Sequence, residues 1–376
     1  MNRKIAPIIT FILSGLLSIS CTKKQNEILV GEYGSLTGSE ATFGLSTNKG
    51  IRMAFDEVNE KGGIKGKKIK LITEDDQGKP DEAAQAVTRL ITQNKVVALL
   101  GEVASGRSKA AAPIANKNKI PMITPASTNP DVTKLGEYIF RTCFIDPFQG
   151  LVMAKFAKEN LGLKTAAILR DVKNDYSVGL ANVFVEEFKK MGGEIVEDLS
   201  YQSGDIDFKA QLTQIKAKNP QTIFIPGYYT EVGLIALQTK QLGIKSVLLG
   251  GDGWDSPKLA EIGKDAVNGN YFSTHYTTES TEPVVVDFVT RFKQRYNETP
   301  DAMAALGYDA ALILANAMTR ASDLKPETIR DEVAKTSDFK GVTGKITLNE
   351  NRDAVKSAVV VQVQGTQLKY ITSVSP

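Results

Sequence analysis

Residues 96–125 read VVALLGEVASGRSKAAAPIANKNKIPMITP. A short apolar run, Val96–Leu100, is followed by a glycine-containing loop, a helix-like segment around Gly106–Asn116, and a second apolar run, Pro121–Thr124. Apolar runs of this length are typical of buried strands, and a strand–helix–strand order predicts parallel pairing. We expect Pro113 to kink or shorten the helix, because proline cannot donate a backbone hydrogen bond. The stretch predicts an α/β fold.

The same alternation precedes this stretch and starts again after it. Upstream, we expect strands at Ile28–Tyr33 and Ile69–Thr73, with helices at Asn48–Asn59 and Asp81–Asn94. Downstream, further strands are expected at Thr165–Arg170, Glu194–Tyr201, Thr222–Pro226, Ser246–Gly250 and Gly269–His275, with helices at Gly179–Met191, Phe208–Lys218 and Glu231–Leu242. Two successive parallel sheets covered by helices predict two doubly wound, Rossmann-like lobes.

The last hundred residues change character. Helices are expected at Val284–Tyr296, Ala302–Ala321 and Pro326–Lys335, followed by strands at Lys345–Leu348 and Ser357–Val363. The simplest arrangement returns these elements to complete each lobe in turn. The chain would then cross between the lobes more than once, so that several strands form a hinge.

The N-terminus predicts export. Arg3 and Lys4 precede an apolar stretch, Ile5–Ile19, that is shorter than the roughly 20 residues needed to span a bilayer. We therefore expect residues 1–20 to be a signal peptide, Cys21 to be lipidated, and residues 21–27 to form a tether. An ordinary cleaved signal with an incidental cysteine is the alternative. No later segment approaches membrane-spanning length, so the membrane is expected to be reached through the anchor alone.

Composition excludes several classes of function. Residues 21–376 are too many for one typical core and suit two lobes. The formal net charge of +3 favours neither nucleic acid nor an anionic membrane surface. If Cys21 is lipidated, Cys143 has no disulfide partner. The single histidine, His275, argues against a secreted hydrolase with a Ser/His/Asp triad and against a His/Cys zinc site. We expect no cofactor and no metal.

Polar and aromatic residues follow the expected strands, where open α/β sheets bind ligands. Ser105 lies where a loop enters a helix, and its hydroxyl and the free N–H groups there suit a carboxylate. In the second lobe Asp252 stands among glycines and aromatic residues, and would suit an ammonium group. A ligand with both charges would be held by one lobe at each end. Plainer interpretations stay open, because Ser105 could be a helix cap and Asp252 could only shape its turn.

Four motifs resemble the periplasmic branched-chain amino-acid-binding proteins, the Leu/Ile/Val-type receptors of ABC transporters. They are Asn59–Lys68 (NEKGGIKGKK), Glu74–Asp76 (EDD), Pro121–Ala126 (PMITPA) and Phe140–Thr142 (FRT). The resemblance runs in the same order over nearly the whole chain after the signal peptide. It implies a type I periplasmic binding protein, with one lobe of residues 28–146 and 277–348 and another of residues 147–276 and 349–376.

The resemblance also implies a set of ligand-binding residues. Ser105 and Thr128 match the hydroxyls that hold the carboxylate, and backbone groups near Ala104 and Ala126 accompany them. The remaining matches are an enclosing phenylalanine, two enclosing tyrosines and the acid that binds the ammonium group: Phe43, Tyr176, Tyr228 and Asp252. Glutamate is common at the last position, so the shorter Asp252 leaves the ligand side chain open.

Together these features predict a lipid-anchored receptor on the periplasmic or cell-surface face of a bacterial membrane. It would act as a monomer, bind an aliphatic amino acid without chemical change, and deliver it to an ABC permease. An amide, urea or aromatic acid as ligand remains an alternative. So does a sensory receptor that presents its closed form to a signalling partner.

Overall fold

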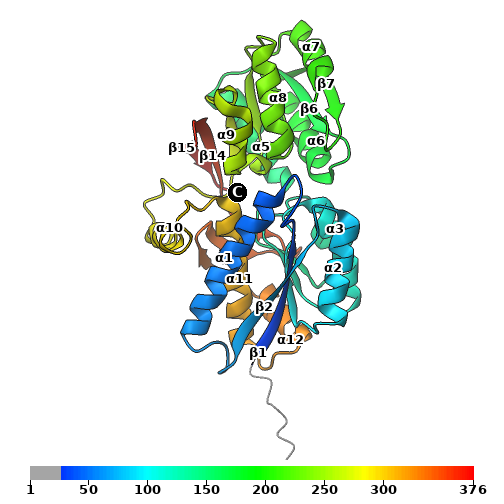
Figure 1. The fold of residues 1–376 in the computed structure, drawn as a ribbon. Helices are drawn as coiled ribbons and strands as arrows, with labels where there is room; N and C mark the ends of the chain where they lie inside the picture. The colour runs from blue at the N-terminus through cyan, green and yellow to red at the C-terminus, as the bar shows by residue number, and fades with distance from the viewer. Residues whose placement is uncertain (1–26) are drawn as a thin grey trace, which may run out of the picture.

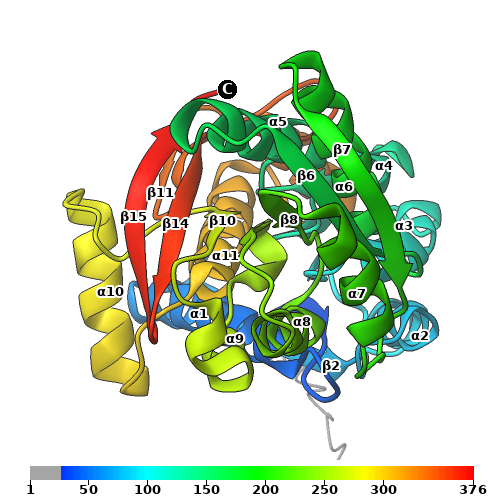
Figure 2. The same cartoon turned by 90° about the horizontal axis from the view of Figure 1, so that it is seen from above.

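The computed structural model describes residues 27–376, so the predicted signal peptide, Cys21 and most of the tether lie outside the described residues. Two sheets form separate lobes, one above the other in Figure 1, and helices cover both. This confirms the expected two-lobed α/β fold. Figure 2 shows the second lobe from above, with the strands of its sheet running across the view.

The first sheet is parallel, with strand order β2-β1-β3-β4-β5. Its strands are β1 (Glu27–Gly34), β2 (Lys68–Asp75), β3 (Ala98–Leu100), β4 (Met122–Thr124) and β5 (Ile139–Arg141). Its helices are α1 (Ala41–Glu60), α2 (Pro80–Thr92), α3 (Ser105–Lys117) and α4 (Asp131–Lys134). Two expectations need correction. The first helix begins seven residues before Asn48, and α3 continues through Pro113 to Lys117 instead of being shortened.

The second sheet is mixed, in the order β15-β14-β10-β9-β8-β6-β7. The parallel strands are β6 (Thr165–Asp171), β7 (Glu194–Tyr201), β8 (Thr222–Phe224), β9 (Val247–Gly250) and β10 (Tyr271–Thr274). At one edge β14 (Ala358–Gln364) and β15 (Gln367–Val374) run antiparallel. The helical segments are α5 (Asp146–Lys155), η1 (Phe156–Asn160), α6 (Asp175–Lys190), α7 (Lys209–Lys218), α8 (Tyr229–Gln241), η2 (Asp252–Trp254), α9 (Pro257–Gly263) and η3 (Lys264–Val267).

The returning segment completes the first lobe before it reaches the second. It contains α10 (Pro283–Tyr296), α11 (Ala302–Arg320), α12 (Pro326–Ala334) and a small sheet of β11 (Phe339–Gly341), β12 (Gly344–Leu348) and β13 (Ala354–Val355). Helix α11 packs along α1 (Figure 1), and the two backbones approach closely at Gly50. A Cβ on Gly50 would lie 2.0 Å from the carbonyl oxygen of Ala304, so only glycine fits there.

Helix α11 also corrects an expectation about membrane spans. Among the described residues it is the one helix long and apolar enough to cross a bilayer, although the sequence suggests none after the signal peptide. In the fold, 83% of its apolar window is buried. The helix is apolar on all sides because it lies in the core between α1 and the small sheet.

The boundary between the lobes differs from the one implied by the resemblance. Residues 349–355, assigned there to the second lobe, lie beside the first sheet. The reason is that β13 pairs with β12, and Arg352 donates hydrogen bonds to the carbonyl oxygens of Ile139 (3.1 Å) and Thr133 (2.9 Å). We therefore propose that the crossing lies near Lys356, directly before β14.

Candidate functional site

A small cavity lies between the two lobes and has about 210 Å³ of empty space. Its lining residues come from loops and helix starts of both lobes: Phe43, Val103, Ser105, Ala126, Thr128, Tyr176, Tyr228, Asp252, Gly253 and Met303. That volume includes open solvent at the mouth of the cavity. The position of the cavity between the lobes, rather than its size, makes it the candidate site.

The wall from the first lobe offers hydrogen-bond donors without a positive charge. Helix α3 begins at Ser105, and the N–H groups of a first helical turn have no partner within the helix. The hydroxyl of Ser105 accepts a hydrogen bond from the Asn129 backbone N–H (3.2 Å), which ties the loop after β3 to the loop after β4. Thr128, in that second loop, is buried and lines the cavity. Hydroxyls and N–H groups at a helix start favour a small anion.

Aromatic rings form the side walls. Tyr176 stands in the first turn of α6, where the Asn174 side chain accepts its backbone N–H (3.0 Å). Tyr228 directly precedes α8, and the two tyrosine rings stack with centroids 5.4 Å apart and planes within 7°. Phe43 reaches across from α1 and meets Tyr228 edge-on at 5.5 Å. These rings would enclose an apolar part of a ligand between the two lobes.

Among the residues that the structure describes, Asp252 is the one carboxylate that lines the cavity. It stands in η2 after β9, and burial raises its pKa to about 7, although a hydrogen bond with Tyr176 favours the charged form. The amide of Gln149 donates to Oδ1 (2.9 Å), and Nε2 of His275 lies 3.0 Å from Oδ2. A buried carboxylate of this kind is stabilised by an added positive charge.

Polar contacts join the lobes around the cavity. Lys109 of α3 lies 3.0 Å from the carboxylate of Asp175 of α6, and Asn129 donates to the Asp175 carbonyl oxygen (3.0 Å). On the other side, the hydroxyl of Thr230 donates to the carbonyl oxygen of Ser39 (2.8 Å). The structure therefore has the two lobes closed on the cavity.

Comparisons with known proteins agree with this arrangement. The sequence profile of the periplasmic binding protein family matches residues 27–367. The chain belongs to this family. Among curated relatives, the leucine-specific-binding protein of Salmonella typhimurium is 30% identical over 355 residues, which cover 94% of each chain.

Two solved structures place the chain among the branched-chain amino-acid-binding members. The leucine binding protein LivK from Thermotoga maritima is 43% identical, with a TM-score of 0.89 over 93% of this chain and 99% of its own. The substrate binding protein LivJ of a branched-chain amino acid transporter from Streptococcus pneumoniae, solved with isoleucine, is 35% identical. Its TM-score is 0.89 over 93% of this chain and 100% of its own.

Sequence reasoning did not find every residue at the cavity. Val103 and Gly253 lie in loops that the strand pattern marks, but nothing in their types distinguishes them. Met303 comes from the start of α11, which follows no strand. Gln149 lies on α5, a helix that the pattern does not predict. His275 is the last residue of the predicted strand Gly269–His275 and directly follows β10, so its position at a strand end was visible in the sequence.

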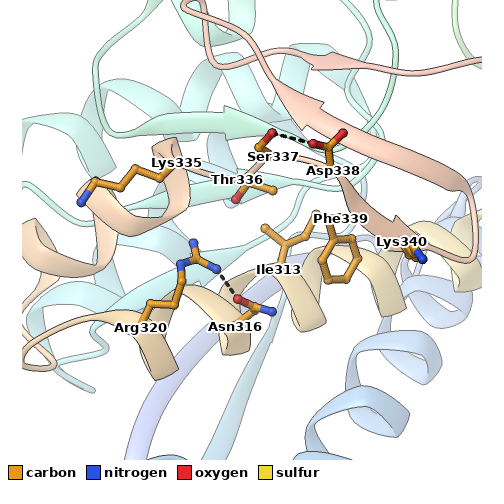
Figure 3. Close-up of a pocket in the computed structure, with 9 residues that line it drawn as sticks. All are labelled: Ile313, Asn316, Arg320, Lys335, Thr336, Ser337, Asp338, Phe339 and Lys340. Carbon is orange, nitrogen blue, oxygen red and sulfur yellow. Dashed lines mark hydrogen bonds between the residues drawn. The ribbon is translucent and has the colours of Figure 1, made fainter.

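A second, larger pocket lies in the first lobe, and none of the predicted site residues lines it. Figure 3 shows its lining side chains. It is lined by Ile313, Asn316, Arg320, Lys335, Thr336, Ser337, Asp338, Phe339 and Lys340. Two of its basic side chains, Arg320 and Lys335, already pair with Glu332 at 3.0 and 2.7 Å. Across residues 27–376, no three His, Cys, Asp or Glu side chains are grouped as a metal site requires.

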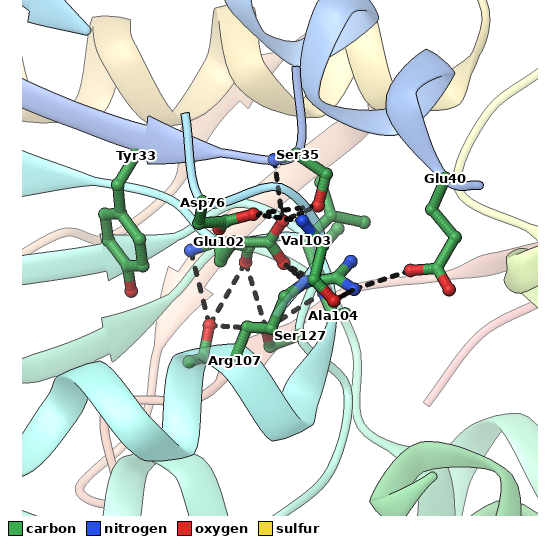
Figure 4. A network of polar contacts seen from close by, with 12 residues as sticks. Tyr33, Ser35, Glu40, Asp76, Glu102, Val103, Ala104, Arg107 and Ser127 are labelled. Carbon is green, nitrogen blue, oxygen red and sulfur yellow. Dashed lines mark hydrogen bonds and ion pairs between the residues drawn. The ribbon is translucent and has the colours of Figure 1, made fainter. Parts of the chain in front are cut away.

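Ala104 is the one predicted residue that the structure does not place on the cavity wall. Its backbone N–H donates to Oε2 of Glu102 and is therefore not free for a ligand (Figure 4). Glu102 also accepts the backbone N–H (3.1 Å) and hydroxyl (2.9 Å) of Ser35. This buried carboxylate fixes the turn that leads into Ser105.

Arg107 neutralises the buried acids behind that turn (Figure 4). Its guanidinium lies 2.9 Å from Glu102 and 2.6 Å from Glu40, and the side chains are 10% exposed or less. Burial raises the pKa of Glu40 although Arg107 opposes it. Burial and the charge of Glu102 together raise the pKa of Asp76 to about 7. Within residues 27–376, Arg107 is the only cation paired with these acids, so its charge decides whether the turn before α3 keeps its shape.

We expect Arg107→Met to destabilise the protein by about 3–5 kcal/mol, because Glu40 and Glu102 would stay buried without their cation. Urea unfolding followed by circular dichroism measures the change. Lys109→Met is the matched control on the same helix, since its partly exposed pair with Asp175 should contribute about 1 kcal/mol or less. Equal losses in the two variants would contradict a special role for the buried network.

Proposed function

We propose that this protein captures a branched-chain or similar aliphatic amino acid between its lobes and delivers it to the permease of an ABC transporter. The observation that carries the proposal is the pairing of opposite chemistries across one small cavity. Donors at the start of α3 suit an anion on one side of the cavity, and the buried Asp252 on the other side suits a cation. The family match, and relatives named for leucine and for branched-chain amino acids, support the same ligand class.

The cavity favours an aliphatic amino acid over the other ligands considered. An aromatic acid or a urea would leave Asp252 buried without a counter-charge, which costs several kcal/mol. An amide of an amino acid would offer no anion to the donors of Ser105 and Thr128. The rings of Phe43, Tyr176 and Tyr228 also line the cavity and would contact an apolar side chain of the ligand.

The cellular setting is part of the proposal. We propose that the protein works outside the cytoplasm as a monomer, held to the membrane by a lipid on Cys21, and releases its ligand unchanged. Support comes from the basic and apolar N-terminus that ends at Ser20-Cys21.

In a cell fractionation, Cys21→Ser should move the protein from the membrane to the soluble fraction. Retention of the substituted protein in the membrane would contradict the anchor.

The ligand assignment is tested by calorimetry of the purified protein with L-leucine, L-isoleucine and L-valine. Asp252→Asn keeps the shape of the side chain but removes its charge, so we expect leucine binding at least about tenfold weaker. The affinity for 4-methylpentanoate, which is leucine without its amino group, should not fall. Asp198→Asn, on β7 and paired with Arg170, is the control for loss of a carboxylate in the same lobe. Wild-type protein that binds none of the three amino acids would contradict the proposal.

Binding should depend on pH because the pKa of Asp252 is raised to about 7. An ammonium group beside the carboxylate favours its charged form, so ligand binding lowers this pKa and releases a proton whenever Asp252 starts protonated. Affinity should therefore be constant above about pH 8 and fall by up to about tenfold per unit below pH 7. Burial also raises the pKa of Asp146 to about 8. Asp146 repels the negative charge of Asp252 only at a pH at which Asp146 is itself charged.

Calorimetry of leucine binding at pH 5.5, 7 and 8.5 measures this dependence. Buffers of different ionisation enthalpy report the released proton directly. Asp252→Asn should flatten the profile, since the carboxyl group that titrates is gone. An affinity in the wild-type protein that does not change from pH 5.5 to 8.5 would show that Asp252 is not the ammonium partner.

A further inference from the structure

Two side chains that do not line the cavity hold the Asp252 carboxylate from behind. Gln149 makes two contacts with the same residue: its Nε2 donates to Asp252 Oδ1 (2.9 Å), and its Oε1 accepts the Asp252 backbone N–H (3.1 Å). His275 approaches the other oxygen, with Nε2 3.0 Å from Oδ2. Both are buried, and they come from elements far apart in the sequence, α5 and the end of β10.

The surrounding backbone and rings fix these two side chains in turn. A Cβ on Gly251 would lie 2.0 Å from Gln149 Oε1, so glycine at this position permits the close approach of the amide. The His275 ring stacks on Phe144, with centroids 3.9 Å apart and planes 21° from parallel. Gln149 and His275 therefore each hold a different oxygen of the carboxylate, and their own neighbours restrict both side chains.

The charge state of His275 matters for what this arrangement does. Burial, together with the nearby Lys356, holds the pKa of His275 well below its usual value, so the ring is neutral. A neutral ring donates from Nε2 to a charged Asp252, and its Nδ1 then has no hydrogen-bond partner among the described residues. Because both donors are neutral, neither of them supplies a counter-charge when the Asp252 carboxyl group is ionised. The carboxylate oxygens have lone pairs beyond those that accept from Gln149 and His275, and a ligand can use them.

We propose that Gln149 and His275 are positioning residues that aim the Asp252 carboxylate at the ligand ammonium group and so select ligands that carry one. The inference rests on the proposed function, since it assigns roles to residues that act through Asp252. Other titratable groups near Asp252 are Tyr176 on α6, Asp146 on α5 and Asp255 after η2. Asp146 and Asp255 offer no donor when charged. Tyr176 hydrogen-bonds Asp252 but lines the cavity, whereas Gln149 and His275 do not line it.

The test compares two ligands that differ only at the amino group. The dissociation constants of L-leucine, by calorimetry, and of 4-methylpentanoate, by competition against leucine, give a discrimination ratio. In Gln149→Met and His275→Leu, which remove one donor each, we expect the ratio to fall about tenfold, through weaker leucine binding. His275→Gln, which can place an amide donor near the position of Nε2, should recover most of the ratio.

The control is Gln238→Met, because Gln238 is also a buried glutamine of the second lobe but bonds only to backbone groups of Phe208 and Ile206. It should change the melting temperature without changing the ratio.

A ratio that stays at the wild-type value in both Gln149→Met and His275→Leu would overturn the inference, as would equal losses for the two ligands. If the wild-type protein itself shows no preference for leucine over 4-methylpentanoate, the proposed function fails instead. Melting curves identify a variant that does not fold, and Gln149→Met, which conserves volume, then decides alone.

Discussion

The structure depends on one constraint: parallel strands end at the same edge of their sheet, and the two sheets turn those edges toward each other. Every loop that reaches the cavity from β3, β4, β6, β8 and β9 leaves the carboxyl end of its strand. The chemistry of each wall then follows from what those loops carry. One edge carries the start of α3 with its free N–H groups, and the other carries a buried carboxylate. Neither wall alone satisfies a ligand with two charges, so recognition requires both lobes.

Much of the fold could be predicted because the buried strands are apolar and their spacing is regular. The elements that were missed are those in which the pattern is weak. Strand β5 has three residues, and α5 has an apolar face too short to show a period. Of the two antiparallel edge strands, only β14 was predicted. The residues of β15 are partly buried or exposed and do not form an apolar run, so the sequence pattern gives no strand there.

The candidate site was predictable where a residue follows a strand and unpredictable where the fold brings in a distant element. Ser105, Thr128 and Asp252 follow their strands directly, so reading strand ends was sufficient. Met303 reaches the cavity because the chain returns to the first lobe after β10, and α11 begins beside the cavity. The backbone N–H of Ala104 donates to the side chain of Glu102. No pattern in the sequence indicates a hydrogen bond between these two residues.

The buried acids of the first lobe have a cation beside them, whereas the buried Asp252 of the second lobe has none. This difference explains why a ligand can stabilise the closed arrangement of the lobes. In the first lobe Arg107 lies between Glu40 and Glu102, so both buried carboxylates have a cation beside them. In the second lobe Asp252 receives only neutral donors, and its charge stays uncompensated within the fold. The direct contacts between the lobes are single polar pairs such as Lys109 with Asp175, which contribute little in water. A ligand shifts the balance toward the closed form only by contacts made there and not in the open form. The uncompensated Asp252 supplies such a contact, because the ammonium group it needs is brought within reach when the first lobe holds the other end of the same molecule.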